Sequence, residues 1–239
     1  MNKLPEYSNR IVAFIDILGF TSLISTLESD TDLHSKLHRA LKFIHSYKQH
    51  SQQDNTVQSD LDISVFSDSI VISSIDCNLF NVIWACGWLQ AELLYLGILT
   101  RGGIAEGSTV HENDILYGEG MIKAYHIESK TAIYPRIIVD ETLFKYTKAN
   151  AISYFLKQDN DGLWFINQFA FDASCDGATH LAADGYDPRL IYFETVENEI
   201  NQGLVKASSL THKSKWTWLK NQFDDAYDIY KVTGETLFD

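Results

Sequence analysis

Two aspartates stand where a fold could use them for chemistry. Asp16 ends the apolar run of residues 11–15 and is followed at once by a turn through Gly19. Such a run predicts a buried strand, and the residues after the turn, 20–27, predict a short helix. Asp68 lies between two serines at the break in residues 61–75, which alternate apolar and polar side chains. This pattern predicts a β-hairpin with Asp68 at its tip.

If the two strands are neighbours, both carboxylates project from the same end of the sheet. Two carboxylates a few ångströms apart repel each other unless a divalent cation lies between them. Two such oxygens, completed by substrate phosphates, are a usual site for Mg²⁺. The glycine turn and the helix start after Asp16 would add amide N–H groups and favour negative charge. Taken alone, each aspartate also fits a plainer interpretation, as a helix cap or a turn residue.

The remaining elements must position these groups. The sequence predicts helices over residues 33–50, 79–96, 119–130, 189–208 and 213–233, and further strands over residues 98–107, 135–140, 154–157 and 163–169. Up to about residue 140 the order is β-α-α-β-β-α-β-α-β, which is typical of a ferredoxin-like α+β sheet, and we expect its helices on one face. We expect a core over residues 1–148 and a mostly helical extension, residues 149–239, packed on it.

Composition limits the classes of function. The chain has 239 residues, 45% of them hydrophobic, and a net charge of −13. This charge argues against coating nucleic acid or binding an anionic membrane surface. The three cysteines form no CxxC pair, the N-terminus has no signal-peptide h-region, and no apolar run reaches the ~18 residues of a membrane span. We therefore expect a reduced, cytoplasmic protein.

The region from residue 10 to 140 resembles a class III nucleotidyl cyclase. Three features carry the resemblance: the opening motif, the later aspartate in a hairpin, and the glycine-rich strand with the helix start after it. Their residues are Phe14, Asp16, Ile17, Gly19, Phe20 and Thr21, then Asp68, then Arg101, Gly103, Ile104, Gly107 and Gly118. The resemblance implies that residues 1–148 are a ferredoxin-like cyclase catalytic core.

The resemblance also implies site roles. Asp16 and Asp68 would bind two divalent ions per site, Mn²⁺ or Mg²⁺, with the main-chain carbonyl of Ile17 as a further ligand. The triphosphate would be bound by the amides of the turn, which are those of Ile17, Leu18, Gly19, Phe20 and Thr21. The reaction would be attack of the ribose 3′-hydroxyl on the α-phosphate, with release of pyrophosphate.

The sequence departs from adenylate cyclases at the base-reading positions. Their purine-reading lysine is Ser64 here, and their partner acid or threonine is Ile115. A site built for other hydrogen bonds should reject adenine strongly.

The transition-state helix departs as well. The family's asparagine and arginine align with Ile122 and His126. His126, Arg101 or Arg136 would then have to supply the missing donor. We also expect Phe14, Ser64 and Tyr117 at the substrate, although a packed Tyr117, a solvated Arg101 and an interface His126 are the plainer interpretations.

The chain resembles in particular the short Pycsar pyrimidine cyclases of bacterial antiviral defence, in the hairpin tip and in the Tyr-Pro-Arg-Ile run at residues 134–137. This implies conversion of UTP, or else CTP, to cyclic UMP or cyclic CMP, which a separate effector reads. It also implies a head-to-tail homodimer in which Tyr117, His126 or Arg101 completes the partner's site. The alternatives are a purine cyclase and an inactive nucleotide-binding regulatory module. Retention of both aspartates favours the enzyme, because a buried like-charge pair is costly without its metal.

Overall fold

The computed structural model describes residues 5–53, 60–112, 115–147, 152–175, 177–179 and 187–233. Its strands are β1 (Ser8–Ile17), β2 (Leu61–Phe66), β3 (Ser69–Ser74), β4 (Thr100–Glu112), β5 (Ile115–Gly118), β6 (Ile137–Val139), β7 (Leu156–Gln158) and β8 (Trp164–Ile166). Its helices are α1 (Phe20–Thr26), α2 (Thr31–Gln53), α3 (Leu79–Tyr95), α4 (Glu119–Lys130), α7 (Pro188–Lys206) and α8 (Leu210–Thr233), with 3₁₀ helices η1 (Glu141–Tyr146) and η2 (Gln168–Ser174).

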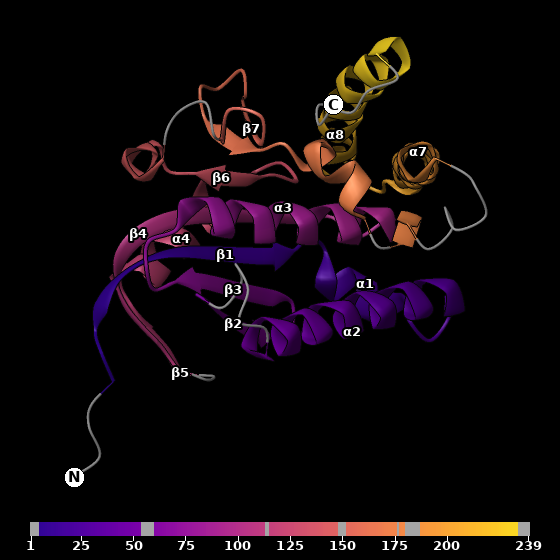
Figure 1. Ribbon diagram of the computed structural model, residues 1–239. Helices are drawn as coiled ribbons and strands as arrows, with labels where there is room; N and C mark the ends of the chain where they lie inside the picture. Colours follow the sequence, from indigo (N-terminus) through magenta and orange to yellow (C-terminus); the bar gives the residue numbers. More distant parts are fainter. Residues whose placement is uncertain are drawn as a thin grey trace.

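One mixed sheet organises the chain (Figure 1), with the order β2-β3-β1-β4-β6-β8-β7 and with β5 paired to β4. The first four strands in sequence run 2-3-1-4 and are antiparallel to their neighbours, which is the ferredoxin-like arrangement. The expected α+β class, with a helical C-terminal part, is confirmed. The predicted strand, hairpin and helix positions agree with the observed elements apart from shifts at their ends.

The central strand β1 buries side chains on both faces because helices cover both. Ile11 and Ile15 belong to the main core, which α2 and α3 cover, whereas Val12 and Phe14 belong to a smaller cluster on the opposite face. This split follows the alternation of side chains along a strand.

Helix α4 lies on that opposite face, so the expectation that all helices share one face is wrong. Its Ala124 and Ile127 pack on the smaller cluster. Gly103 of β4 permits this, because a Cβ there would lie 2.6 Å from the carbonyl oxygen of Ala124. Gly120 does the same from the helix, since its Cβ would lie 3.0 Å from the carbonyl oxygen of Gly107. Helix α4 therefore rests directly on the backbone of β4.

The chain beyond residue 152 extends the same sheet before it turns helical. Strands β8 and β7 add to β6, which is itself parallel to β4. The boundary expected at residues 148–149 lies outside the described residues. Figure 1 shows α7 and α8 at the end of the molecule toward which β1 points. None of the helices in the described part of the chain is both long and apolar enough to cross a bilayer.

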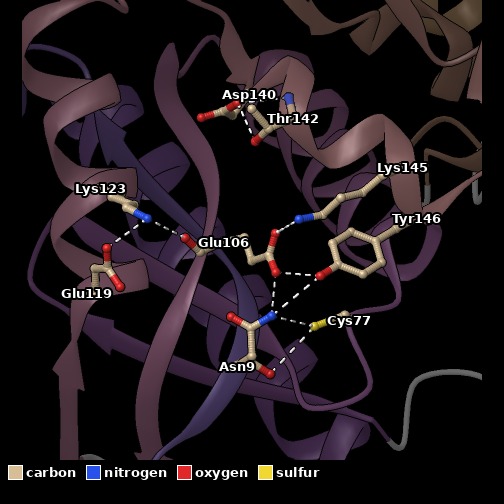
Figure 2. A network of polar contacts seen from close by, with 9 residues as sticks. All are labelled: Asn9, Cys77, Glu106, Glu119, Lys123, Asp140, Thr142, Lys145 and Tyr146. Carbon is tan, nitrogen blue, oxygen red and sulfur yellow. Dashed lines mark hydrogen bonds and ion pairs between the residues drawn. The ribbon is translucent and has the colours of Figure 1, made fainter.

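A polar network at Glu106 joins β1, β4 and η1 (Figure 2). The Glu106 carboxylate accepts hydrogen bonds from Asn9 and Tyr146 and pairs with Lys145 at 2.6 Å. These partners lower the pKa of Glu106 to about 2, against the opposing effect of burial. The network therefore favours the ionised carboxylate in the folded protein.

We expect Glu106→Gln to destabilise the fold by on the order of 1 kcal/mol at neutral pH, because three partners lose their anion. The folded pKa lies below the ordinary 4.5, so this stabilisation is complete above pH 4.5 and is lost as the pH falls toward 2. Urea unfolding of both proteins across this range checks it, and the difference in stability should shrink on acidification. Glu119→Gln is the control, because its pair with Lys123 is exposed and should contribute little. A pH-independent difference at Glu106 would contradict the prediction.

Candidate active site

The strand register brings together Asp16 and Asp68, the two aspartates that the sequence analysis expects at one site. Asp16 lies opposite Ser69, and the N–H of Ile17 donates to the carbonyl oxygen of Asp68 at 3.0 Å. Ser67, with a φ of 56°, forms the left-handed tip that turns Asp68 toward β1. The two acids therefore sit side by side at the end of β1 and the start of β3.

Arg101 and Glu128 complete the cluster. Arg101 is the register partner of Asp16 on β4, and its Nε lies 3.6 Å from Asp16 Oδ2. The same Nε lies 2.7 Å from Glu128 Oε1, on a side chain only 3% exposed. Glu128 was missed in the sequence, although it follows Ala124 by one helical turn and so falls on the inner stripe of α4. An acidic residue on the buried side of a predicted helix is the sequence pattern that indicates Glu128 as a site residue.

The cluster carries more negative than positive charge. Burial raises the pKa of Asp16, Arg101 opposes this, and the Asp68 carboxylate raises it further. Burial also raises the pKa of Glu128, with Arg101 opposing and both aspartates adding to the rise. One guanidinium thus faces three acids, and a cation would relieve their repulsion.

The donor set fits a divalent metal held by two carboxylates. Within the described residues no three His, Cys, Asp or Glu side chains converge as a closed metal site. Magnesium-type sites in nucleotide enzymes typically use one or two carboxylates and take their other ligands from water and phosphate. Asp16, Asp68 and the carbonyl of Ile17 match that pattern.

The turn after β1 offers fewer amides than expected. Gly19 has a φ of 74°, which a glycine adopts without strain, and α1 starts directly after it. The N–H of Ile17 is used by Asp68, and the N–H of Leu18 donates to the carbonyl of Leu99 at 2.8 Å. The first-turn amides of Gly19, Phe20 and Thr21 remain for a phosphate. The expectation that Ile17 and Leu18 also donate is therefore corrected.

Phe14 and Ser64 lie on the face of the sheet that carries α4, and both are buried. Phe14 packs edge-on against Tyr125 of α4, with ring centroids 5.4 Å apart. The Ser64 hydroxyl lies 2.8 Å from Nε2 of His111, whose Nδ1 lies 2.8 Å from the hydroxyl of Ser73. Phe14 lies on the same face of β1 as Asp16, two residues earlier, but its ring packs against α4, and the Ser64 hydroxyl is engaged by His111.

Tyr117 and His126 lie away from the cluster. Tyr117 pairs with Val110, whereas Asp16 pairs with Arg101 nine residues earlier on β4 (110 − 101 = 9). At the rise of a strand this is roughly 30 Å. Tyr117 is 53% exposed, and His126 is on the exposed side of α4 with Ile122. In this chain these residues are too distant, or turned away, to complete the site of Asp16.

Arg136 is a structural residue, which corrects the expected substrate contact. It is 1% exposed, and its two terminal nitrogens are bound by Asp159 and Asp161. Its guanidinium also lies over the ring of Trp218 at 5.9 Å. Both acids and the tryptophan come from the later part of the chain, so the sequence motif around Arg136 gave no sign of these partners.

The sequence matches no protein-family model and no curated protein sequence. Among solved structures, two of bacterial light-regulated adenylyl cyclases are similar. The first has 14% sequence identity and a TM-score of 0.45, and the match covers 83% of this chain and 60% of that one. The second has 12% sequence identity and a TM-score of 0.47, and the match covers 80% of this chain and 100% of that one. The guanylyl cyclase Cya2 has 11% identity and a TM-score of 0.38, over 68% and 93%. Likenesses of this size assign no activity, so the function must be argued from the site.

We expect Asp16→Asn to raise the melting temperature of the metal-free protein at neutral pH and to abolish stabilisation by Mn²⁺. The raised pKa of Asp16 means that its ionised form costs stability once the pH exceeds the folded pKa. A gain of about 1 kcal/mol corresponds to roughly 2–4 °C in a chain of this size. The gain in melting temperature should disappear below pH 3.8, the ordinary pKa of an aspartate, because Asp16 is then neutral in both the folded and the unfolded protein.

Thermal melts with and without Mn²⁺ measure both effects, since a bound metal stabilises the folded state. Asp76→Asn, at an exposed aspartate beyond the other end of β3, is the control and should keep the metal shift. A less stable Asp16→Asn protein that still responds to Mn²⁺ would exclude the metal site.

Proposed function

We propose that the protein is a nucleotide cyclase that converts a pyrimidine nucleoside triphosphate to its 3′,5′-cyclic monophosphate and pyrophosphate. The observation that carries this proposal is the pair Asp16 and Asp68, held side by side next to the open first turn of α1. A carboxylate pair suited to divalent ions beside free amides is what an attack on a triphosphate requires.

Each group has a role in this reaction. The amides of Gly19, Phe20 and Thr21 bind phosphate oxygens and orient the chain for in-line attack. Asp16 and Asp68 would hold Mn²⁺ or Mg²⁺, which would lower the pKa of the 3′-hydroxyl and compensate charge on the leaving pyrophosphate. Arg101, fixed beside Asp16 by Glu128, donates to the α-phosphate as charge develops there. The O3′–phosphorus bond forms, the bond to the β-phosphate oxygen breaks, and the hydroxyl proton leaves to solvent.

The base-reading positions support a pyrimidine. Ser64 hydrogen-bonds within a buried Ser–His–Ser set, and Ile115 is 61% exposed, so neither position offers the charged pair that reads adenine. We favour UTP over CTP, as the resemblance to uridylate cyclases implies.

A head-to-tail homodimer would complete the site. Tyr117 and His126 are distant from or turned away from Asp16 in one chain, yet they lie on a surface with several exposed apolar side chains. These include Ile115, Ile122 and Tyr125. An apolar surface of this kind suits a protein interface, and a second copy could bring Tyr117 to the base and His126 to the phosphates.

We further propose that the product is a second messenger in antiviral defence, read by a separate effector. This role rests on the resemblance in the hairpin tip and in residues 134–137. Product that accumulates in cells only after phage infection would support it.

The direct assay incubates the purified protein with each ribonucleoside triphosphate and Mn²⁺ and detects cyclic products by mass. We expect cyclic UMP, and a fall of ~10²-fold or more for Asp68→Ala, because metal stabilisation amounts to several kcal/mol. Asp76→Ala serves as the matched control. If the product is cyclic AMP or cyclic GMP, the protein is a nucleotide cyclase but the pyrimidine assignment is wrong. If the triphosphate binds and no cyclic product forms, the protein is a regulatory module.

The shared site predicts complementation between two inactive proteins. Asp68→Ala lacks the metal site, and a Tyr117→Ala/His126→Ala double variant lacks the groups expected from the partner. Co-expressed with different tags and purified as the mixed dimer, they should have activity that neither has alone, because one of the two sites is intact. Activity no higher than the average of the parents would show that each chain acts alone.

A further inference from the structure

Helix α8 brings a lysine to the turn beside the aspartates. A cavity of about 170 Å³ separates α8 from the turn after β1. Leu18, Gly19 and Ser22 line one wall, and Lys215 and His212 line the other. The cavity therefore opens on the same turn whose amides remain unused.

The position of Lys215 on α8 is fixed by its neighbours. Trp218 donates from Nε1 to Asp159 at 2.8 Å and stacks on Tyr134, with ring centroids 5.5 Å apart. Leu219 is fully buried. Residues three and four apart share one side of a helix, so Lys215 lies on the same inward side as these two. A lysine on the inner side of a helix is uncommon unless it has a partner.

Among the ion pairs between described residues, none involves Lys215. Burial lowers its pKa, Arg101 lowers it further, and Asp16 opposes both. The ammonium is therefore close enough to respond to the charges of the cluster, and it repels the guanidinium of Arg101. Lys215 and His212 bring basic side chains to the cavity, and none of the described residues that line it is acidic, which suits an anionic ligand.

We propose that Lys215 binds the polyphosphate of the substrate, so that the C-terminal extension supplies part of the active site. This inference rests on the proposed function and extends it to a residue outside the resemblance. The cavity adjoins the free amides of Gly19, and a mobile ammonium suits a phosphate as a point charge. His212 lines the same wall and adds a second nitrogen donor. The extension thereby offsets the loss of the arginine at the position of His126.

The test uses inorganic tripolyphosphate with Mn²⁺ as the probe, measured by calorimetry on the full chain. We expect Lys215→Met, which keeps the apolar stem, to weaken binding by at least tenfold and Lys215→Arg to restore most of it. Lys213→Met, at an exposed position two residues away, is the matched control and should stay within twofold of the wild type. Circular dichroism confirms that each variant is folded.

The outcomes separate this inference from the proposed function. If the wild type makes a cyclic nucleotide while Lys215→Met keeps its tripolyphosphate affinity and its KM for the triphosphate, the inference is wrong and the function stands. If tripolyphosphate binds in a Lys215-dependent manner but no cyclic nucleotide forms, the polyphosphate contact stands and the cyclase function is wrong. A wild-type protein that does not bind tripolyphosphate overturns the inference whatever its activity.

Discussion

The fold holds two like charges together where they would otherwise separate. Asp16 and Asp68 are adjacent because the amide of Ile17 is bonded to the carbonyl of Asp68 and because β1 is paired on both sides. The side chains that alternate with Asp16, Ile15 and Ile17, are buried in the main core. A shift of β1 by one residue would remove both from the main core and would turn Asp16 to the wrong face. The apolar core thus sets the position of the carboxylates.

The same logic explains why Arg101 does not simply neutralise Asp16. Its Nε is nearer to Glu128, at 2.7 Å, than to Asp16, at 3.6 Å. Because Glu128 engages the guanidinium from the buried side, part of the negative charge of the aspartate pair is left uncompensated. A cluster with one guanidinium and three acids keeps negative charge that a divalent metal would compensate.

Local patterns predicted the local parts of this arrangement. The apolar run before Asp16 and the alternating hairpin around Asp68 predicted the observed strands β1, β2 and β3. What escaped prediction depends on contacts between distant segments. The partners of Arg136 lie in a loop more than twenty residues later, at Asp159 and Asp161, and no periodicity links them.

Other parts of the site escaped for the same reason. The loss of the Leu18 amide to Leu99 depends on how the strand ends meet, which a single sequence does not encode in its spacing. The approach of Lys215 depends on the packing of α8, some two hundred residues from the turn that it faces. Glu128 differs, because its position one helical turn after Ala124 is sufficient to place it on the inner side of α4 from the sequence alone.

The direct packing of α4 on the backbone of β4 limits which substitutions this protein can accept during evolution. Gly103 and Gly120 leave no room for even a methyl group between helix and strand. Variation on the inner side of α4 would displace the helix and with it Glu128. Its outer side, which carries Ile122 and His126, is exposed and can accept new side chains without moving the sheet. New substrates or new donors can therefore be acquired on one surface of a helix while the opposite surface stays fixed, so chemistry can diversify with little cost to folding.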